Sequence, residues 1–301
     1  MKKWLSVLLL AMLVFSLAAC VSQQDDKASE SKKETTNTKE VFKIGAIPDQ
    51  NAADLDKGMT AVAKYLSEKT GMKVEFVPSV DYAALVTGFQ RGEIHMAWFG
   101  GLTSVQAVNL VPGAESFAQR PRDAEFHSVF ITQPNSGITK LEDLKGKSFT
   151  FGSESSTSGH LMPRYFLTEA GIDPNKDFDG KPNFSGSHDT TYKLVESGAF
   201  KAGALNEAVW EAAVKEGKVD SNKVKVFYTT PAFFDYNWTI NSNVDDVFGD
   251  GAKKKVEDAI LSITTNQKEI TDFFQTDKFI ETKNDNYKKI QKVAKELNII
   301  K

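Results

Sequence analysis

A run of hydroxyl side chains at residues 152–160, GSESSTSGH, is the segment of this chain best suited to ligand chemistry. It follows an apolar stretch typical of a buried strand and leads into LMPRYFLTEAG, which has the pattern of a helix. Hydroxyls beside the free N–H groups of a helix start favour an oxyanion, because the amides and the helix dipole both favour negative charge. A single helix cap would use only one hydroxyl, so a ligand site explains the run better than capping does. The candidate residues are Ser155, Ser156, Thr157 and Ser158.

Other junctions between a predicted strand and a predicted helix carry further candidates. Tyr82 opens a predicted helix and could point its hydroxyl into a cleft, or could be a core aromatic. His188, in SGSHD, could donate a hydrogen bond to an anion or pack on the surface. The segment GGLTS at residues 100–104 adds two glycines and two hydroxyls after a strand. Such neutral donors at helix starts resemble sites that hold tetrahedral anions without formal positive charge.

Asp235 follows PAFF. A carboxylate there could receive an amine of a ligand, or could disfavour ligands with extra negative charge. It could equally be a surface turn residue.

Catalytic and metal-binding patterns do not appear. The serines of GSESS lack the second glycine of a G-x-S-x-G elbow, and no P-loop or G-x-G-x-x-G follows a strand. The four histidines lack the spacing of a zinc site. We therefore expect no catalytic residues, no metal and no cofactor. A binding protein is the favoured interpretation, and a phosphoester-processing enzyme is the weaker alternative. A purely structural surface protein would not need so many hydroxyls at helix starts.

The first twenty residues predict export. Lys2 and Lys3 precede an apolar run, and Leu-Ala-Ala-Cys ends it at Cys20. The run is shorter than the roughly 20 residues that span a bilayer. Because LAAC resembles the bacterial lipobox, we expect lipid on Cys20 and a lipid-anchored position on the extracytoplasmic face of the cell membrane. Cys20 is the only cysteine, which excludes an internal disulfide.

Residues 21–40 contain no aromatic side chain and almost nothing apolar, so they predict a flexible tether. The remaining roughly 260 residues can bury a large core as one domain or two lobes. The net charge of −3 argues against nucleic-acid binding.

The body predicts alternating strands and helices, and therefore parallel sheets with helices on both faces. The expected strands are 42–47, 73–77, 94–99 and 148–151, and the expected helices include 55–66, 82–91, 161–170 and 190–197. After Trp238, three further helices at 252–263, 267–274 and 286–297 should pack on earlier elements.

Four motifs together give the chain a family resemblance: DYAALVTGFQRGEIHMAWFGG, SSTSGHLMP, SHDTTYKLVESGAFKAGALNEAVW and TTPAFFDYNW. It resembles the phosphate, phosphite and phosphonate-binding receptors of ABC importers. That resemblance implies an α/β fold of the type II periplasmic-binding-protein class, with two lobes, two crossover strands and C-terminal helices on the first lobe. It also implies that Ser156, Thr157 and Ser158 hold tetrahedral oxygens, with Tyr82 and His188 in the same site.

Two residues depart from the pattern of the family. Phe99 stands where many members have tyrosine, and His95 where many have aspartate. The identity of the ligand therefore does not carry over, although we keep Phe99 in the predicted ligand set. The WFGGLTSVQA and GALNEAVW segments are similar to a branch of selenate receptors, so selenate or another oxyanion is the alternative ligand.

The predicted organisation is a signal at 1–20, the tether at 21–40, lobe 1 at 41–127 plus 233–301, and lobe 2 at 128–232. The predicted partners are a small oxyanion, a permease and its ATPase, and the membrane through Cys20. We expect a monomer that delivers phosphonate, phosphite or a phosphate-like anion for import.

Overall fold

The computed structural model describes residues 40–300. The predicted signal, the lipidation site at Cys20 and nearly all of the predicted tether lie outside the described residues. Across that described range, no helix has both the length and the apolar character needed to cross a membrane.

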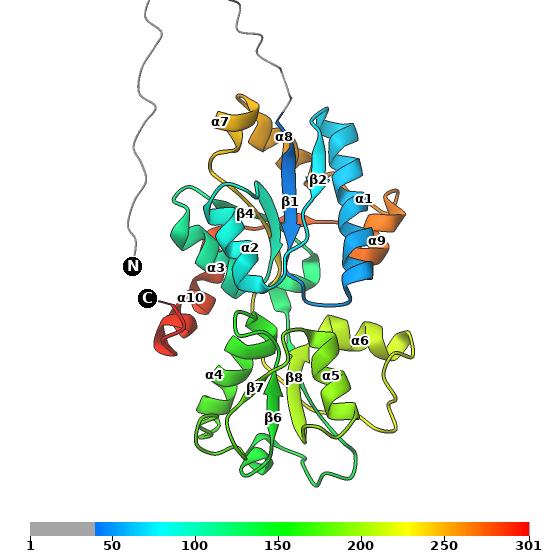
Figure 1. Cartoon of the computed structure of the whole chain (residues 1–301), viewed down its shortest axis with the longest axis vertical. Helices are drawn as coiled ribbons and strands as arrows, with labels where there is room; N and C mark the ends of the chain where they lie inside the picture. Colours follow the sequence, from blue (N-terminus) through cyan, green and yellow to red (C-terminus); the bar gives the residue numbers. More distant parts are fainter. Residues whose placement is uncertain (1–39, 301) are drawn as a thin grey trace, which may run out of the picture. The chain divides into compact units, whose positions relative to one another are not determined.

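Two sheets form the centre of residues 40–300, and Figure 1 shows them above and below one another. The first has the strand order β11-β4-β10-β3-β1-β2. Its strands are β1 (Phe42–Ala46), β2 (Val74–Phe76), β3 (Met96–Phe99), β4 (Glu115–Gln119), β10 (Asn237–Ile240) and β11 (Ile280–Glu281). The second has the order β7-β6-β8-β5-β9. Its strands are β5 (Ser128–Thr132), β6 (Phe149–Phe151), β7 (Asn183–Phe184), β8 (Ala202–Asn206) and β9 (Lys225–Thr229).

The prediction of wholly parallel sheets is wrong in part. Strands β2, β1 and β3 are parallel, as are β7, β6 and β8. Strand β10 runs antiparallel to β3 and β4, and β5 runs antiparallel to β8 and β9. The exceptions arise because the chain passes between the sheets twice, from β4 to β5 and from β9 to β10, so these strands enter from the opposite end.

The two passages between the sheets lie side by side. The N–H of Phe126 donates to the carbonyl of Phe233 at 2.8 Å, and the N–H of Phe233 donates back at 2.9 Å. Their rings pack edge to face, with centroids 6.2 Å apart. This pair joins the two crossover segments and confirms the predicted double connection.

Helices cover both faces of each sheet, as the alternation of strand and helix patterns in the sequence predicts (Figure 1). The first sheet carries α1 (Ala52–Thr70), α2 (Tyr82–Gln90), α3 (Gly101–Leu110), α7 (Val244–Phe248), α8 (Ala252–Leu261), α9 (Lys268–Phe274) and α10 (Lys288–Glu296). The second carries α4 (Met162–Glu169), α5 (His188–Glu196) and α6 (Glu207–Lys215). Short helical turns complete the chain: η1 (Pro121–Glu125), η2 (Leu141–Leu144), η3 (Thr157–Leu161) and η4 (Asn284–Tyr287).

The side chains of β5 alternate between the two faces of the second sheet, which explains why helices must cover both faces. Phe130 packs into one apolar cluster with Leu167 of α4, whereas Val129 and Ile131 face another with Tyr192 of α5. Side chains of a strand alternate between faces, so an unbroken apolar strand requires cover on each side.

The C-terminal helices pack on the first sheet and its helices, which confirms the prediction. Helices α8 and α9 lie against α1, and α10 lies against α3. The ring of Phe273 in α9 stands so close to Gly58 in α1 that a Cβ there would lie 2.2 Å from it. A glycine is therefore required for this close approach of two helices.

Polar side chains fix the helix starts that face the region between the sheets. Asp81 caps α2 through the N–H of Ala84 at 2.7 Å, and Asn206 caps α6 through the N–H of Val209 at 3.0 Å. Ser187 caps α5, which therefore begins at His188 and not at Thr190 as the sequence predicted. The corrected start places His188 in the first turn.

Candidate functional site

Five of the predicted ligand residues lie in one buried polar cluster, which we call the hydroxyl cluster. Its members are Tyr82, Ser156, Thr157, Ser158 and Asp235, each at most 2 % exposed. Tyr82 opens α2 beside the first sheet, the serine-threonine turn opens η3 beside the second, and Asp235 lies between β9 and β10. Residues far apart in the sequence thus meet where the two sheets face each other.

The serine-threonine turn is built by contacts to its own glycines and to the opposite side. The Ser156 hydroxyl accepts the N–H of Gly159 at 2.9 Å, which makes it the cap of η3. The Thr157 hydroxyl accepts the N–H of Leu102 at 2.9 Å, from the first turn of α3. A Cβ on Gly159 would lie 2.9 Å from the Ser156 hydroxyl and 3.1 Å from the Gly152 Cα, so the tight approach requires glycine.

Asp235 is fully buried, so its interpretation as a surface turn residue is wrong. Its Oδ1 accepts the N–H of Gly101 at 2.9 Å, at the start of α3. Its Oδ2 has no hydrogen-bond partner among the described residues. Burial raises the pKa of this carboxyl to about 7, against the lowering effect of the Gly101 amide and the hydroxyls of Thr157 and Ser158.

The Tyr82 hydroxyl is the second orphan of the hydroxyl cluster. It is buried and lacks a hydrogen-bond partner within the described part of the chain. Burial, followed by the nearby carboxylates of Asp49 and Asp235, raises its pKa well above its usual range. Tyr82 therefore keeps its proton and is a donor.

His188 lies behind this cluster, fully buried, so the alternative that it packs on the surface is wrong. Its Nδ1 accepts the N–H of Asn206 at 3.3 Å, so the proton of the neutral ring sits on Nε2. Nε2 lies 3.4 Å from the Tyr236 hydroxyl. Burial lowers the pKa of His188 to about 3, so the ring is neutral at physiological pH.

Phe99 and Ser155 are placed differently from the hydroxyl cluster. Phe99 is buried and packs edge to face on Phe89 of α2, with centroids 5.5 Å apart. It shares that helix with Tyr82 but offers no polar atom. Ser155 is half-buried, and its N–H bonds to the Ser153 hydroxyl at 3.3 Å. Their contact with a ligand stays a prediction.

Three residues beside this site, Asp49, Asn206 and Tyr236, are not among the predicted ligand residues. The Tyr236 hydroxyl donates to Asp49 Oδ2 at 2.8 Å, and the Asn206 amide donates to the Tyr236 hydroxyl at 2.8 Å. Asp49 does follow the first predicted strand, a position where ligand sites are common. Nothing in the sequence indicates that Asn206 and Tyr236 meet it.

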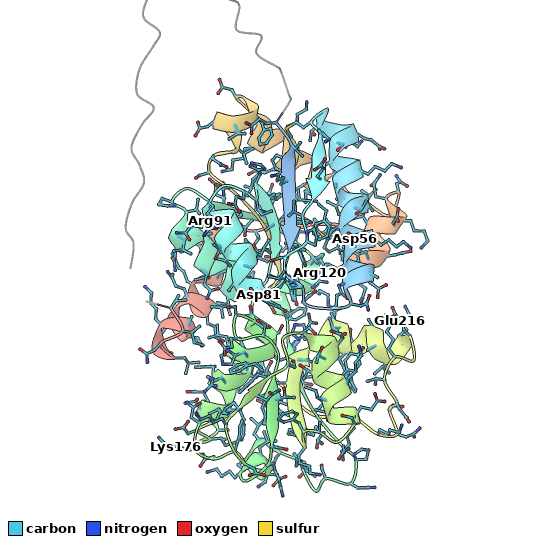
Figure 2. The ribbon with its side chains drawn as sticks, viewed as in Figure 1. Asp56, Asp81, Arg91, Arg120, Lys176 and Glu216 are labelled. Carbon is cyan, nitrogen blue, oxygen red and sulfur yellow. The ribbon has the colours of Figure 1, made fainter. Side chains whose placement is uncertain are left out.

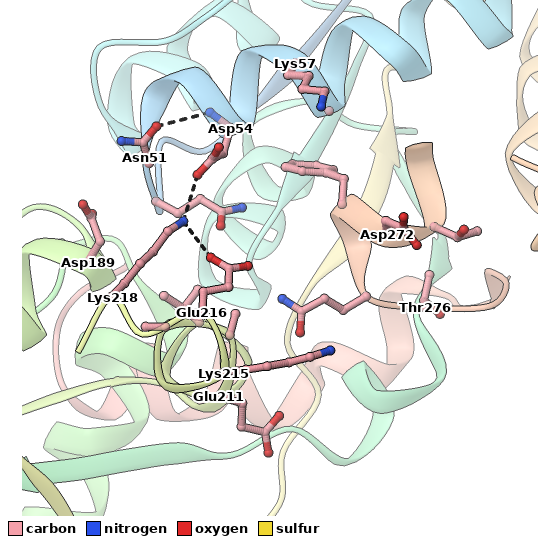
Figure 3. A pocket seen from close by; sticks show the side chains of 18 of the residues that line it. Asn51, Asp54, Lys57, Asp189, Glu211, Lys215, Glu216, Lys218, Asp272 and Thr276 are labelled. Atoms are coloured by element: carbon pink, nitrogen blue, oxygen red, sulfur yellow. Dashed lines mark hydrogen bonds and ion pairs between the residues drawn. The ribbon is translucent and has the colours of Figure 1, made fainter. Parts of the chain in front are cut away.

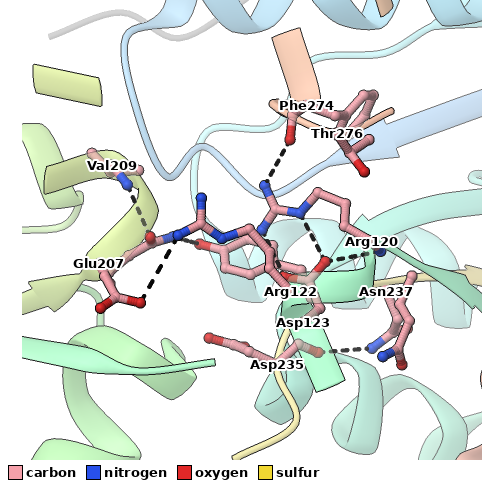
Figure 4. A network of polar contacts seen from close by, with 12 residues as sticks. Arg120, Arg122, Asp123, Glu207, Val209, Asp235, Asn237, Phe274 and Thr276 are labelled. Carbon is pink, nitrogen blue, oxygen red and sulfur yellow. Dashed lines mark hydrogen bonds and ion pairs between the residues drawn. The ribbon is translucent and has the colours of Figure 1, made fainter. Parts of the chain in front are cut away.

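Arg120 is a buried cation, and Figures 2 and 4 show its position. Its guanidinium donates to both carboxylate oxygens of Asp123, at 2.8 and 2.7 Å, and to the carbonyl of Phe274 at 3.2 Å. It also lies over the rings of Trp98 and Tyr236, 5.4 and 5.2 Å from their centroids. This arginine is committed to structure, so the anion-binding capacity of the hydroxyl cluster comes from neutral donors.

A wide, open pocket of about 1230 Å³ lies apart from the hydroxyl cluster, and we call it the rim pocket (Figure 3). It is lined by α1, α5, α6 and α9 and by charges of both signs. Lys218 spans it by pairing with Asp54 at 3.2 Å and with Glu216 at 2.8 Å. All three side chains are about half exposed. An exposed site of mixed charge is less suited to a small anion than the closed hydroxyl cluster.

Residues 40–300 contain no group of three or more His, Cys, Asp or Glu side chains arranged to hold a metal ion. The hydroxyl cluster offers hydroxyls, amides and one carboxyl, and its N–H and O–H groups can donate to an oxyanion.

Two sheets joined by two crossovers, with a buried polar cluster between them, define a two-lobed substrate-binding protein of the type II fold. The family model described as "ABC transporter, phosphonate, periplasmic substrate-binding protein" matches residues 44–287. This chain belongs to that family, and it is an extracytoplasmic binding component of an ABC transporter.

Two curated relatives are similar to the chain. A probable ABC transporter phosphite-binding protein, PhnD1 of Prochlorococcus marinus, is 43 % identical over 271 residues, covering 87 % of this chain and 91 % of the relative. A phosphate-import protein, PhnD of Mycolicibacterium smegmatis, is 28 % identical over 71 % of this chain and 72 % of the relative. The crystal structure of P. marinus PhnD1 with methylphosphonate has a TM-score of 0.84 and 41 % identity, covering 86 % of this chain and 99 % of that one.

Proposed function

We propose that this protein captures a small phosphorus oxyanion that carries a P–OH proton, such as phosphite or methylphosphonate, and delivers it to a permease. The observation that carries the proposal is the pair of buried orphans in the hydroxyl cluster, the Tyr82 hydroxyl and Asp235 Oδ2. Buried polar atoms are rarely left without partners, so each calls for an atom of the ligand.

The two orphans have opposite demands. Tyr82 is a donor and needs an oxygen that accepts, whereas an ionised Asp235 is an acceptor and needs a ligand proton. The hydroxyls of Ser156, Thr157 and Ser158 can supply further donors, and the start of α3 adds the favourable end of a helix dipole. His188 has one further N–H, at Nε2, which lies 3.4 Å from the Tyr236 hydroxyl.

A proton shared between the ligand and Asp235 would make the site bind phosphorus oxyanions in preference to selenate. The second ionisation of a phosphoryl group falls near neutrality, so the ligand can keep a hydroxyl or regain one. Selenate is fully ionised there, and it would meet the Asp235 carboxylate as a like charge. Selenate binding is therefore expected to strengthen only as pH falls through about 7, where Asp235 takes up the proton itself. PhnD1 of P. marinus, a probable phosphite-binding protein that was crystallised with methylphosphonate, supports the phosphorus ligands.

Calorimetric titration at about pH 8, above the pKa of Asp235, tests this proposal. Phosphite and methylphosphonate should bind at least tenfold more tightly than selenate or sulfate. Their binding should take up protons, which is seen as a binding enthalpy that varies with the ionisation enthalpy of the buffer. Asp235→Asn should weaken the phosphorus ligands by about ten- to a hundredfold, since a hydrogen bond to a charged group contributes about 1.5–3 kcal/mol. It should also narrow their advantage over selenate, because an amide can donate to a fully ionised oxygen.

Asp81→Asn is the matched control, because Asp81 is an exposed cap of α2 and asparagine caps equally well. Wild-type protein that binds selenate as tightly as methylphosphonate would contradict the proposal. Incubation with a small phosphate ester, followed by phosphorus NMR, separates the two functions, because a receptor leaves the ester unchanged whereas a phosphoester-processing enzyme hydrolyses it.

We also propose the lobe boundaries 41–127 plus 233–301 and 128–232, a monomeric state, and a lipid anchor on Cys20. The strand membership of the two sheets supports the boundaries. Cys20→Ser should release the protein from the membrane fraction or leave it unprocessed. A variant that still fractionates with membranes at mature length would contradict the anchor.

A further inference from the structure

A buried chain of hydrogen bonds connects the two sides of the molecule through three residues outside the hydroxyl cluster. Asn206 Nδ2 donates to the Tyr236 hydroxyl, which in turn donates to Asp49 Oδ2, each at 2.8 Å. Each of the three is at most 5 % exposed. Asp49 follows β1 of the first sheet, Asn206 ends β8 of the second, and Tyr236 directly precedes β10.

The orientation of each group in this chain is fixed by a further bond. Asn206 Oδ1 accepts the N–H of Val209 as the cap of α6, so the amide nitrogen must face Tyr236. The Tyr236 ring stacks on Trp98, with centroids 5.6 Å apart. A second bond joins the same two sides, because the N–H of His188 donates to the Asp49 carbonyl at 3.0 Å.

We propose that Asp49, Tyr236 and Asn206 form a latch that sets the balance between open and closed lobes, acting as positioning residues and not as ligand contacts. The proposal rests on the proposed function, with the oxyanion captured between two lobes that close over it. Separation of the sheets would break the links of Asp49 to the second sheet and return its carboxylate to water. The latch therefore acts on closure whether or not a ligand is bound.

The charge of Asp49 makes this latch sensitive to pH. Burial raises the pKa of Asp49 to about 6, while the hydrogen bond from Tyr236 and the charge of Arg120 lower it and the charge of Asp189 raises it. Tyr82 and Tyr236 face it as neutral hydroxyls, and His188 as a neutral ring. In an open form the solvated carboxyl would return toward its ordinary value of 3.8. The pKa of Asp49 is higher in the closed form than in the open form, so protonation of Asp49 favours closure. This effect is complete below about pH 4 and is lost as pH rises through about 6.

Two substitutions should move the balance in opposite directions. Tyr236→Phe keeps the ring on Trp98 but leaves a buried carboxylate without its donor, so the ligand-free protein should open and affinity should fall about tenfold. Asp49→Asn keeps an acceptor oxygen for Tyr236 and removes a buried charge, so the ligand-free protein should close and ligand dissociation should slow severalfold. The ratio of methylphosphonate to phosphite affinity should stay unchanged in both.

The test combines small-angle scattering of the ligand-free proteins with stopped-flow measurement of methylphosphonate dissociation between about pH 4 and 7, around the pKa of Asp49. Tyr65→Phe is the matched control, since the Tyr65 hydroxyl bonds to Ser262 at 2.9 Å within the elements of the first sheet alone.

A Tyr236→Phe protein with an unchanged radius of gyration and an altered affinity ratio would identify a ligand contact and overturn the latch. A pH dependence of the ligand-free radius in Asp49→Asn that matches the wild-type one between about pH 4 and 6 would also overturn it. Failure of the wild-type protein to bind any phosphorus oxyanion would instead count against the proposed function, since the radii of the ligand-free variants do not depend on it.

Discussion

The hydroxyl cluster and the rim pocket both lie between elements of the two sheets, yet they are organised in opposite ways. The hydroxyl cluster is closed to water and contains two polar atoms that lack partners among the described residues, Tyr82 Oη and Asp235 Oδ2. The rim pocket is open, and its Lys218 is already paired with Asp54 and Glu216 (Figure 3).

This difference indicates where binding energy is available. Exposed ion pairs typically contribute about 0.2–1 kcal/mol, because water already solvates both partners. A buried donor or acceptor without a partner costs about 1–3 kcal/mol, which a ligand recovers when it supplies the partner. A small anion therefore gains most at the site with fewer charges.

The largest effect is expected in the serine-threonine turn. Thr157→Val keeps the side-chain volume but removes the hydroxyl that accepts the Leu102 N–H and faces Asp235. Affinity for methylphosphonate should fall by about ten- to a hundredfold. Ser185→Ala is the control, because the Ser185 hydroxyl bonds to Ser187 and Thr191 beside α5. Equal affinities of the two variants in calorimetry would mean that the turn only caps a helix.

An intermediate effect is expected at Gly100, where the first sheet meets the hydroxyl cluster. A Cβ at this position would lie 3.2 Å from both Asp235 Oδ1 and Thr157 Oγ1. Gly100→Ala should therefore hinder the approach of the two sides and weaken binding severalfold. Gly88→Ala in α2 is the control, since its nearest neighbour lies at 3.4 Å and alanine favours a helix. A Gly100→Ala protein that binds normally would show that the sides need not approach this closely.

The smallest effect is expected at the rim pocket. Lys218→Ala removes the pairs with Asp54 and Glu216, and affinity should change by less than about fivefold, less still at high salt. A loss of affinity as large as that of Thr157→Val would indicate that the ligand binds at the rim pocket and not in the hydroxyl cluster.

Much of the fold is already determined by the sequence, because local patterns carry it. Apolar strands, the helix that Tyr82 opens and the serine-threonine turn are short-range features, and their predicted positions agree with the structure within a few residues. The family resemblance added the two crossovers. The antiparallel strands escaped prediction because strand direction depends on how the chain passes between sheets, a long-range property.

Only the tertiary structure decided the environment of the polar groups. From the sequence, Asp235 could be a surface turn residue or a ligand residue. The structure buries it between the sheets, which excludes the surface turn. Asp49, Asn206 and Tyr236 stand far apart in the chain, and no local pattern indicates that their side chains form one hydrogen-bonded chain. The types of groups available were set by the sequence. Their partners, and the pKa values that follow from burial, were set by the packing of one sheet against the other.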